Sequence, residues 1–253
     1  MPCAVGRHRT PPLAAAEVRH ATIDSELELG VPDPSLGRRL VAEFTGTAML
    51  VAIVIGSGIA ASRMSADTGL QLLENAAATG AGLIALILTF GHVSGARFNP
   101  LISAVAVLDG DLRPGHAGLE VLVQVAGGIV GAALANLMFD LGAVAWSTHD
   151  RVTSATFVAE VAATFGLLTV ILGVVRSPRA DAVAYAVGAY IAAAYWFTSS
   201  TSFANPAVTI ARTVTDTFAG IAPASAPAFI GAQILGAGAA VLLDRYLYPR
   251  SLR

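Results

Sequence analysis

The sequence predicts an all-α membrane protein with six transmembrane helices, two re-entrant half-helices and an inverted internal repeat. The first observation is composition: of 253 residues, 55% are hydrophobic and 13% are charged, with a mean hydropathy of +0.68. Soluble domains carry about 25% charged residues, so a chain this apolar is expected in a bilayer. The other two observations are six long apolar segments and a pair of Asn-Pro motifs in matching places of two similar halves.

The N-terminal segment differs from the rest of the chain. Residues 1–37 hold several prolines and scattered charges, and they lack the apolar core of a signal peptide. We expect this tail to be disordered and cytoplasmic, and residues 38–253 to form one membrane domain with halves at about 38–140 and 155–248. The single cysteine, Cys3, lies in the tail, so no disulfide framework and no cysteine metal site is expected.

Six apolar segments are long enough, or nearly long enough, to cross a hydrocarbon core of about 30 Å. They are predicted at Leu40–Ala61, Ala76–Gly91, Leu119–Phe139, Thr156–Val175, Ala182–Phe197 and Ala226–Leu247. The second and fifth are short for complete spans, and both run directly into an Asn-Pro loop, as a chain that re-enters the membrane would. Small residues at Gly127, Gly131 and Gly236 predict a close approach between helices.

Each Asn-Pro pair is expected to begin a half-helix within the membrane. Asparagine caps the free N–H groups of a helix start, and proline fits the first helical position without losing a needed donor. The apolar runs that follow, Leu101 to Leu108 and Ala207 to Val214, reach only about 13 Å, or roughly half of the hydrocarbon core. One Asn-Pro pair is typical of an ordinary capped helix, but two in matching places favour re-entrant half-helices.

The two halves repeat the same order of polar residues. A glutamate in the first span, an Asn-Pro pair and a glutamine in the third span recur in the second half. The repeated pairs are Glu43 and Glu160, Asn99 and Asn205, and Gln124 and Gln233. Because each half has an odd number of spans, the second half must be inverted in the membrane relative to the first. Inverted repeats with broken helices are typical of transport proteins.

The arginines predict the orientation of the chain. With the N-terminus inside, twelve arginines fall on the inner side and three, Arg63, Arg151 and Arg212, on the outer side. This bias indicates that both termini are cytoplasmic, that the Asn99 loop enters from inside and that the Asn205 loop enters from outside. No basic run suggests a nucleic acid as a partner.

The half-helices are expected to bring their N-termini together near the middle of the membrane. Each N-terminus carries roughly half a positive charge and several unsatisfied N–H groups. Asn99 and Asn205 add side-chain donors, so a water or hydroxyl oxygen can accept from both while a cation is repelled. This arrangement predicts a passage for small uncharged molecules.

Glu43 and Glu160 lie within predicted spans, where an ionisable group is usually functional. They could relay protons in a coupled transporter, or they could accept hydrogen bonds from the backbone of the re-entrant loops, which lipid cannot satisfy. Their symmetric placement favours the second, loop-supporting role. Gln124 and Gln233 are expected to be polar partners between helices, and His92 a hydrogen-bonded residue beside the first half-helix.

The chain resembles the aquaporin, or major intrinsic protein, family. The resemblance rests on Ala-Glu-Phe-Thr-Gly-Thr at 42–47, Gly-His-Val-Ser-Gly-Ala-Arg-Phe-Asn-Pro at 91–100 and Asn-Pro-Ala at 205–207, and it covers about residues 38–248. It implies a bacterial aquaglyceroporin-like channel of the inner or plasma membrane, with one pore in each subunit of a homotetramer. It also implies passive conduction without a cofactor or energy coupling. The scattered histidines show no metal-ligand spacing, so no metal site is expected. The pore motifs that the resemblance marks are Asn99, Pro100, Leu101, Asn205, Pro206 and Ala207.

The departures from the family pattern concern the narrow outer ring of the pore. Many relatives have an arginine directly after the second Asn-Pro-Ala, where this chain has Val208. Counting along the resemblance places the other ring positions at Thr79, Ser202 and Ala193. All four are uncharged, which predicts a wider and less polar ring than a strict water filter. Arg212, one helical turn beyond Val208, could replace the missing cation or could simply occupy the C-terminus of the half-helix, where the dipole favours arginine.

The sequence therefore predicts a passive transmembrane channel for water and glycerol-like polyols. One alternative is a channel for neutral metalloid hydroxides such as arsenous acid, which resemble a small polyol in size and hydrogen bonding. An alternative of another class is a proton-coupled secondary transporter that uses Glu43 and Glu160. No nucleophile–base set and no phosphate-binding loop is visible, so we expect no enzymatic activity.

Overall fold

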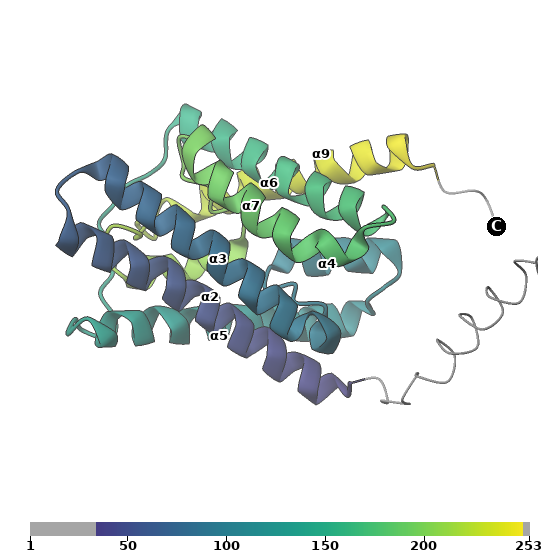
Figure 1. Cartoon of the computed structure of the whole chain (residues 1–253), viewed down its shortest axis with the longest axis horizontal. Helices are drawn as coiled ribbons and strands as arrows, with labels where there is room; N and C mark the ends of the chain where they lie inside the picture. The colour runs from purple at the N-terminus through teal and green to yellow at the C-terminus, as the bar shows by residue number, and fades with distance from the viewer. Residues whose placement is uncertain (1–33, 250–253) are drawn as a thin grey trace, which may run out of the picture. The chain divides into compact units, whose positions relative to one another are not determined.

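The computed structural model describes residues 34–249 (Figure 1). The chain divides into the units Met1–Pro34 and Ser35–Arg253, and every described helix belongs to the second unit. The disorder predicted for residues 1–37 concerns a segment that lies almost entirely outside the described residues.

The described part of the chain is all-α, as the sequence predicts. Five helices are long and apolar enough to cross a membrane, and a sixth, α7, has 15 residues and follows a 3-10 turn at Ala180–Ala182. The six are α2 (Leu36–Met64), α3 (Thr68–Ser94), α5 (Pro114–Met138), α6 (Ser154–Val175), α7 (Val183–Phe197) and α9 (Ala226–Leu247). The half-helices are α4 (Pro100–Asp109) and α8 (Pro206–Ala211), with α8 continued by a 3-10 turn at Arg212–Val214. This confirms the predicted six helices and two half-helices.

The second span begins earlier than the sequence predicts. Helix α3 starts at Thr68 instead of Ala76, and the Asp67 side chain caps it by accepting a hydrogen bond from the Leu70 amide at 3.0 Å. Polar residues near position 75 break the apolar run, which hides the first turns of the helix. Asn75 is nevertheless buried, because its Nδ2 donates to the Val54 carbonyl and to the Ser57 hydroxyl of α2, both at 2.8 Å.

Small residues set the closest helix crossings. A Cβ added at Gly127 or Gly131 of α5 would overlap the backbone of Phe44 or Ala48 in α2, and one at Gly236 of α9 would overlap the backbone of α6. These glycines therefore permit the close approach that the sequence predicts, because any larger side chain would push the helices apart. The α2–α5 crossing in the first half thus has its counterpart in the α6–α9 crossing of the second half.

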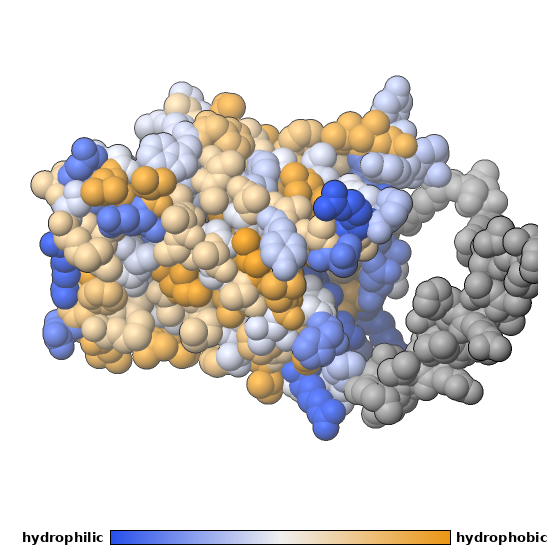
Figure 2. Space-filling view, in the orientation of Figure 1, coloured by the Kyte–Doolittle hydropathy of each residue, from blue (hydrophilic) through white to orange (hydrophobic). Residues whose placement is uncertain are grey.

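The outer surface of the helical unit is apolar over its middle. Figure 2 shows hydrophobic residues across the centre of this face, with hydrophilic residues gathered toward its two ends. Large side chains such as Leu122, Val158 and Leu242 are more than 60% exposed. Apolar residues exposed on helices of spanning length are expected to face lipid or a neighbouring subunit.

Candidate functional site

The two Asn-Pro motifs start the two half-helices in the same way. The Asn99 Oδ1 accepts a hydrogen bond from the Leu101 amide at 3.0 Å, and Pro100 occupies the first turn of α4. The Asn205 Oδ1 accepts from the amides of Ala207 and Val208 at 2.9 and 3.3 Å. Each asparagine therefore satisfies backbone donors that a helix start leaves free.

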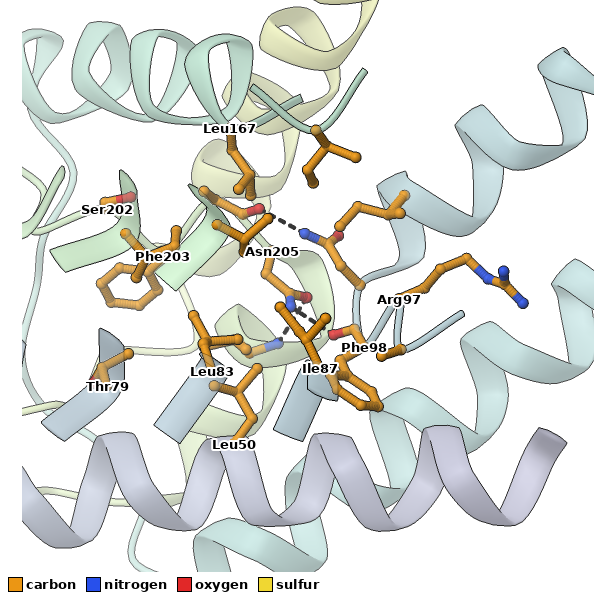
Figure 3. A pocket seen from close by; sticks show the side chains of 18 of the residues that line it. Leu50, Thr79, Leu83, Ile87, Arg97, Phe98, Leu167, Ser202, Phe203 and Asn205 are labelled. Atoms are coloured by element: carbon orange, nitrogen blue, oxygen red, sulfur yellow. Dashed lines mark hydrogen bonds between the residues drawn. The ribbon is translucent and has the colours of Figure 1, made fainter. Parts of the chain in front are cut away.

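The two motifs are also tied to each other. The Asn99 Nδ2 donates to the Ala204 carbonyl at 2.8 Å, and the Asn205 Nδ2 donates to the Phe98 carbonyl at 2.7 Å (Figure 3). The half-helix N-termini consequently meet at one place in the fold. Because a side-chain amide has two N–H donors, each asparagine keeps a second N–H for another acceptor.

The loops before the asparagines share an unusual backbone. Ala96 and Phe98 have φ of 46° and 49°, and their counterparts Ser202 and Ala204 have φ of 52° and 47°. Residues other than glycine seldom occupy this left-handed region, and holding them there costs of order 1–3 kcal/mol each. The strain therefore needs support from surrounding side chains.

Glu43 supplies this support in the first half. Its buried carboxylate accepts hydrogen bonds from the Ser94 hydroxyl at 2.6 Å, the Arg97 amide at 3.0 Å, the Phe98 amide at 2.7 Å and the Gln124 Nε2 at 2.8 Å. Four donors on one carboxylate hold the strained loop in place. They match the loop-supporting interpretation of Glu43, since its oxygens already have structural partners.

Glu160 makes the corresponding contacts in the second half. It is fully buried and accepts from the Phe203 and Ala204 amides at 2.9 and 3.0 Å and from the Gln233 Nε2 at 2.7 Å. Gln233 also donates to the Thr209 hydroxyl of α8 at 2.9 Å, as Gln124 donates to the Ser103 hydroxyl of α4 at 3.1 Å. Each half therefore braces its own loop with a glutamate and a glutamine.

His92 does not match its expectation. It lies in the last turn of α3 and is exposed, and its imidazole makes no hydrogen bond to any residue in the range 34–249. The brace of the first loop comes instead from Ser94, two residues further along, whose hydroxyl points inward to Glu43. Two residues correspond to about 200° around a helix, which places His92 and Ser94 on opposite faces.

The halves differ in the side chains beside the loops. Arg97 donates through Nε and Nη2 to buried Glu120 at 2.8 and 2.5 Å, and Glu120 also accepts from the Ser103 hydroxyl at 3.0 Å. In the second half Phe203 packs edge-on against Phe229, with ring centroids 5.1 Å apart. Sequence reasoning missed Glu120, although a carboxylate at the start of the third predicted span was the available signal.

A narrow cavity passes the crossed loops. It has a volume of about 110 Å³, and Asn99, Asn205 and residues of both loops line it, with Asn205, Phe98 and Phe203 labelled in Figure 3. Aliphatic side chains from four helices also line it. They include Leu50 of α2, Leu83 and Ile87 of α3, Leu167 of α6, and Val187 and Ile191 of α7. We call this space the central cavity; its lining combines two asparagine amides with many aliphatic side chains.

The predicted ring is found in part at one end of the central cavity. Thr79, Ser202 and Val208 line it, but Ala193 does not, and the Ala193 side chain is exposed. Tyr195 lies there instead, with its hydroxyl 3.2 Å from the Thr79 hydroxyl. The placement of Ala193 was wrong because counting residues does not give the rotation of a helix: Tyr195 is two positions after Ala193 in α7, which is about 200° further around the helix.

Arg212 lines the same end of the cavity. It is 2% exposed, its Nε donates to the Ala219 carbonyl at 2.5 Å, and its guanidinium carbon lies 3.4 Å from the centre of the Phe203 ring. The lining of this cavity therefore includes a charged side chain in addition to the uncharged Thr79, Ser202 and Val208.

A second arginine, Arg151, holds the loop that contains Ala219. It donates through Nε to the Gly220 carbonyl at 2.6 Å and through Nη2 to the Phe218 carbonyl at 2.9 Å. With Arg212, it thus satisfies three successive carbonyl groups. Burial lowers the pKa of Arg151, while the negative charge of Glu160 opposes that effect.

Two further cavities adjoin the central one. The first, of about 730 Å³, lies beside α4 and shares Arg97, Ile102 and Ile171 with the central cavity. The second, of about 350 Å³, lies beside Arg151 and the start of α3 and shares Arg212 with the central cavity. We call them the α4-side cavity and the α3-start cavity. Each of the two therefore borders the central cavity at shared lining residues.

An ion-pair cluster borders the α4-side cavity. Arg176 donates through Nε and Nη2 to the two carboxylate oxygens of Asp244, both at 2.6 Å. The hydrogen bonds with Asp244 raise the pKa of Arg176.

Within residues 34–249, no group of three or more His, Cys, Asp or Glu side chains could hold a metal ion.

Helices in an inverted repeat, with two crossed Asn-Pro half-helices beside a cavity that both asparagines line, are typical of a multi-pass membrane channel. Residues 31–182 match the sequence profile of the family described as Major intrinsic protein. The chain belongs to this family, that of the aquaporins, whose members are channels and not enzymes.

Known relatives extend the similarity along most of the chain. The aquaglyceroporin AqpS of Rhizobium meliloti is 50% identical over 84% of this chain and 91% of that protein. An aquaporin of Oryza sativa subsp. japonica is 32% identical over 65% of this chain and 54% of that protein. The X-ray structure of the aquaglyceroporin from Plasmodium falciparum matches with a TM-score of 0.68 and 19% identity, over 84% of this chain and 95% of the other, which supports the fold.

Proposed function

We propose that this chain is a passive channel for glycerol-sized neutral polyols, with water as a second permeant. The observation that carries the proposal is the mixed lining of the central cavity, which combines asparagine amides with aliphatic side chains. A polyol has both hydroxyl groups and carbon surface, so it can contact both kinds of lining group. The identity to a relative named an aquaglyceroporin supports the same substrate class.

The flux should not depend on a proton gradient. A proton relay needs a carboxylate that exchanges protons with solvent, whereas Glu43 and Glu160 are fully buried and hydrogen-bonded to loop amides and glutamines. The coupled-transporter alternative therefore has less support than the passive channel.

Stopped-flow light scattering of proteoliposomes tests the proposal. Water, glycerol, urea and arsenous acid gradients are applied in parallel, with and without a pH gradient, and empty liposomes serve as the control. We expect glycerol flux well above the control and unaffected by the pH gradient. Water flux without glycerol flux would refute the polyol assignment, arsenous acid flux without glycerol flux would favour the metalloid alternative, and gradient-dependent uptake would favour the transporter.

We further propose that the protein is a homotetramer of the cell membrane with both termini in the cytoplasm. The arginine distribution supports the orientation, and the exposed apolar faces of the helices leave surface for lipid and for neighbouring subunits. Cys3 is the single cysteine, so an impermeant maleimide should label the full chain only after the cells are permeabilised. Native mass spectrometry of detergent-purified protein should give a mass of four chains.

A further inference from the structure

We infer that Arg212 supplies the donors and the positive charge of the outer narrowing, in place of the residue directly after the second Asn-Pro-Ala. The inference rests on the proposed channel function and assigns a specificity-determining residue to it. The first observation is position. Arg212 lines both the central cavity and the α3-start cavity, so it lies between these two spaces.

The second observation is that the guanidinium is fixed but incompletely bonded. The Nε–H is used by the Ala219 carbonyl, and the planar group lies against the Phe203 ring. Neither Nη atom has a hydrogen-bond partner among the residues of the described range. A guanidinium has five N–H donors, and buried donors require acceptors, so the remaining four point to water or to the oxygen of a passing solute.

A third observation concerns the neighbouring hydroxyl groups. The Ser202 Oγ is buried without a hydrogen-bond partner in the described range, and Ser202 lines the central cavity together with Arg212. The hydroxyl pair of Thr79 and Tyr195 borders the same end. Guanidinium and hydroxyl groups together form a donor-rich site for the hydroxyl oxygens of a neutral polyol.

The short side chain of Val208 leaves room for the Arg212 guanidinium at the narrowing. Val208 and Arg212 are four residues apart, which puts them on the same side of the half-helix. Val208 is 5% exposed and carries no group that would compete with the guanidinium for the narrowing. The cation is thus one turn further along the chain than in relatives with arginine at the earlier position, and it reaches the passage from there.

The charge of Arg212 is not neutralised by an ion pair. No carboxylate lies within 4.0 Å of its guanidinium in the part of the chain that the structure describes, and the neighbouring Arg151 adds charge of the same sign beside the α3-start cavity. Glu160 lies near enough to act on Arg212 through space, but its oxygens face the loop amides. The narrowing therefore presents a net positive group, which repels cations, whereas a neutral solute meets no charge repulsion and can accept hydrogen bonds from the guanidinium.

A purely structural role for Arg212 would be to hold the outer loop at Ala219. Arg151 provides the matched control for that role, because it bonds the flanking carbonyl groups of Phe218 and Gly220 and also contacts the Phe203 ring, at 5.7 Å. It lines the α3-start cavity but not the central cavity. A variant of either arginine should weaken the loop, whereas only the loss of Arg212 should change selectivity.

The experiment compares Arg212→Gln, Arg212→Lys and Arg151→Gln with the parent in proteoliposomes. Potassium and methylammonium leak are measured beside glycerol and water flux, with thermal melting as the folding control. We expect Arg212→Gln to raise cation leak by about tenfold or more, since losing a charge in a low-dielectric passage changes the barrier by at least about 1.4 kcal/mol. Arg212→Lys should keep the low leak, and Arg151→Gln should lower the melting temperature without a leak.

The outcomes separate this inference from the proposed function. A parent that passes no glycerol refutes the polyol channel, whereas an unchanged cation leak in folded Arg212→Gln refutes the role of Arg212. An equal leak in Arg151→Gln would show that loop disorder is the cause and would also overturn the inference. If Arg212→Gln does not fold, the double variant Val208→Arg/Arg212→Val decides: restored folding with parental cation exclusion supports the assignment, and restored folding with a leak contradicts it.

Discussion

Asn99 and Asn205 are cross-linked through each other's loops: each side-chain amide donates to the carbonyl of the residue before the other asparagine, at 2.8 and 2.7 Å. One amide group thus caps its own half-helix through oxygen and holds the opposite loop through nitrogen. The positive ends of both half-helices are thereby fixed beside the same short stretch of the central cavity.

Replacing both asparagines by aspartate should weaken the barrier to cations. Asn99→Asp/Asn205→Asp puts two carboxylates at the half-helix N-termini and removes both donors between the loops, so an oxygen would face each carbonyl. We expect measurable cation conductance in planar bilayers and a lower melting temperature. Asn205→Asp alone is the intermediate control. A folded double variant with the same ion conductance as the parent would show that the barrier to cations does not lie at the half-helix N-termini.

Val208→Arg should reduce glycerol permeation far more than water permeation. An added guanidinium narrows the end of the central cavity, and it can donate to a passing water while it obstructs a bulkier molecule. Because Arg212 lines the same end, the two cations would lie one turn apart and lower expression is a second expected effect. Stopped-flow rates for both solutes provide the measurement, with Val208→Leu as the uncharged control. Equal losses in well-folded protein would contradict a narrowing that discriminates by size.

Removing either buried carboxylate should destabilise its loop. In Glu43→Gln or Glu160→Gln, an amide replaces an oxygen that accepts from backbone N–H groups, so buried donors lose their acceptor at a cost of about 1–3 kcal/mol or more. Glu43→Gln should have the larger effect, because Glu43 accepts from four donors and Glu160 from three. Melting temperatures in detergent show which of the two variants is less stable. Variants that are as stable as the parent and have unchanged glycerol flux would show that these glutamates are not needed to hold the re-entrant loops.

Gly131→Ala should separate α2 from α5. The new methyl group would overlap the Ala48 carbonyl, a backbone atom that cannot move aside on its own. Gly118→Ala in the same helix is the matched control, because nothing lies within 4 Å of the added Cβ. We expect the free energy of unfolding to fall by about 1–3 kcal/mol in Gly131→Ala, because of overpacking. It should not change in Gly118→Ala. Similar melting temperatures for both variants would show that the crossing tolerates a methyl group.

Much of this site was predictable because its signals are local. An Asn-Pro pair specifies a cap and a first helical turn by itself, and a glutamate in an apolar span requires a donor, so the paired motifs and the paired glutamates identified the re-entrant loops. The rest depended on partners distant in sequence. The burial of Asn75 within α3 depends on acceptors on α2, and the place of Tyr195 depends on the rotation of α7. The direction of Arg212 depends on Phe203 and Ala219.

The hydrogen bonds between the two asparagine loops can form only after both loops have been synthesised. Glu43 finds its loop and glutamine donors within the first half of the chain, so that brace can form early. The acceptor of the Asn99 amide, Ala204, is 105 residues further along. At about 5–20 residues translated per second, the first half-helix waits roughly 5–20 s in the nascent chain before its partner exists. A ribosome stalled between the two motifs should therefore leave a braced but open half, which the insertion machinery must shield until the second loop arrives.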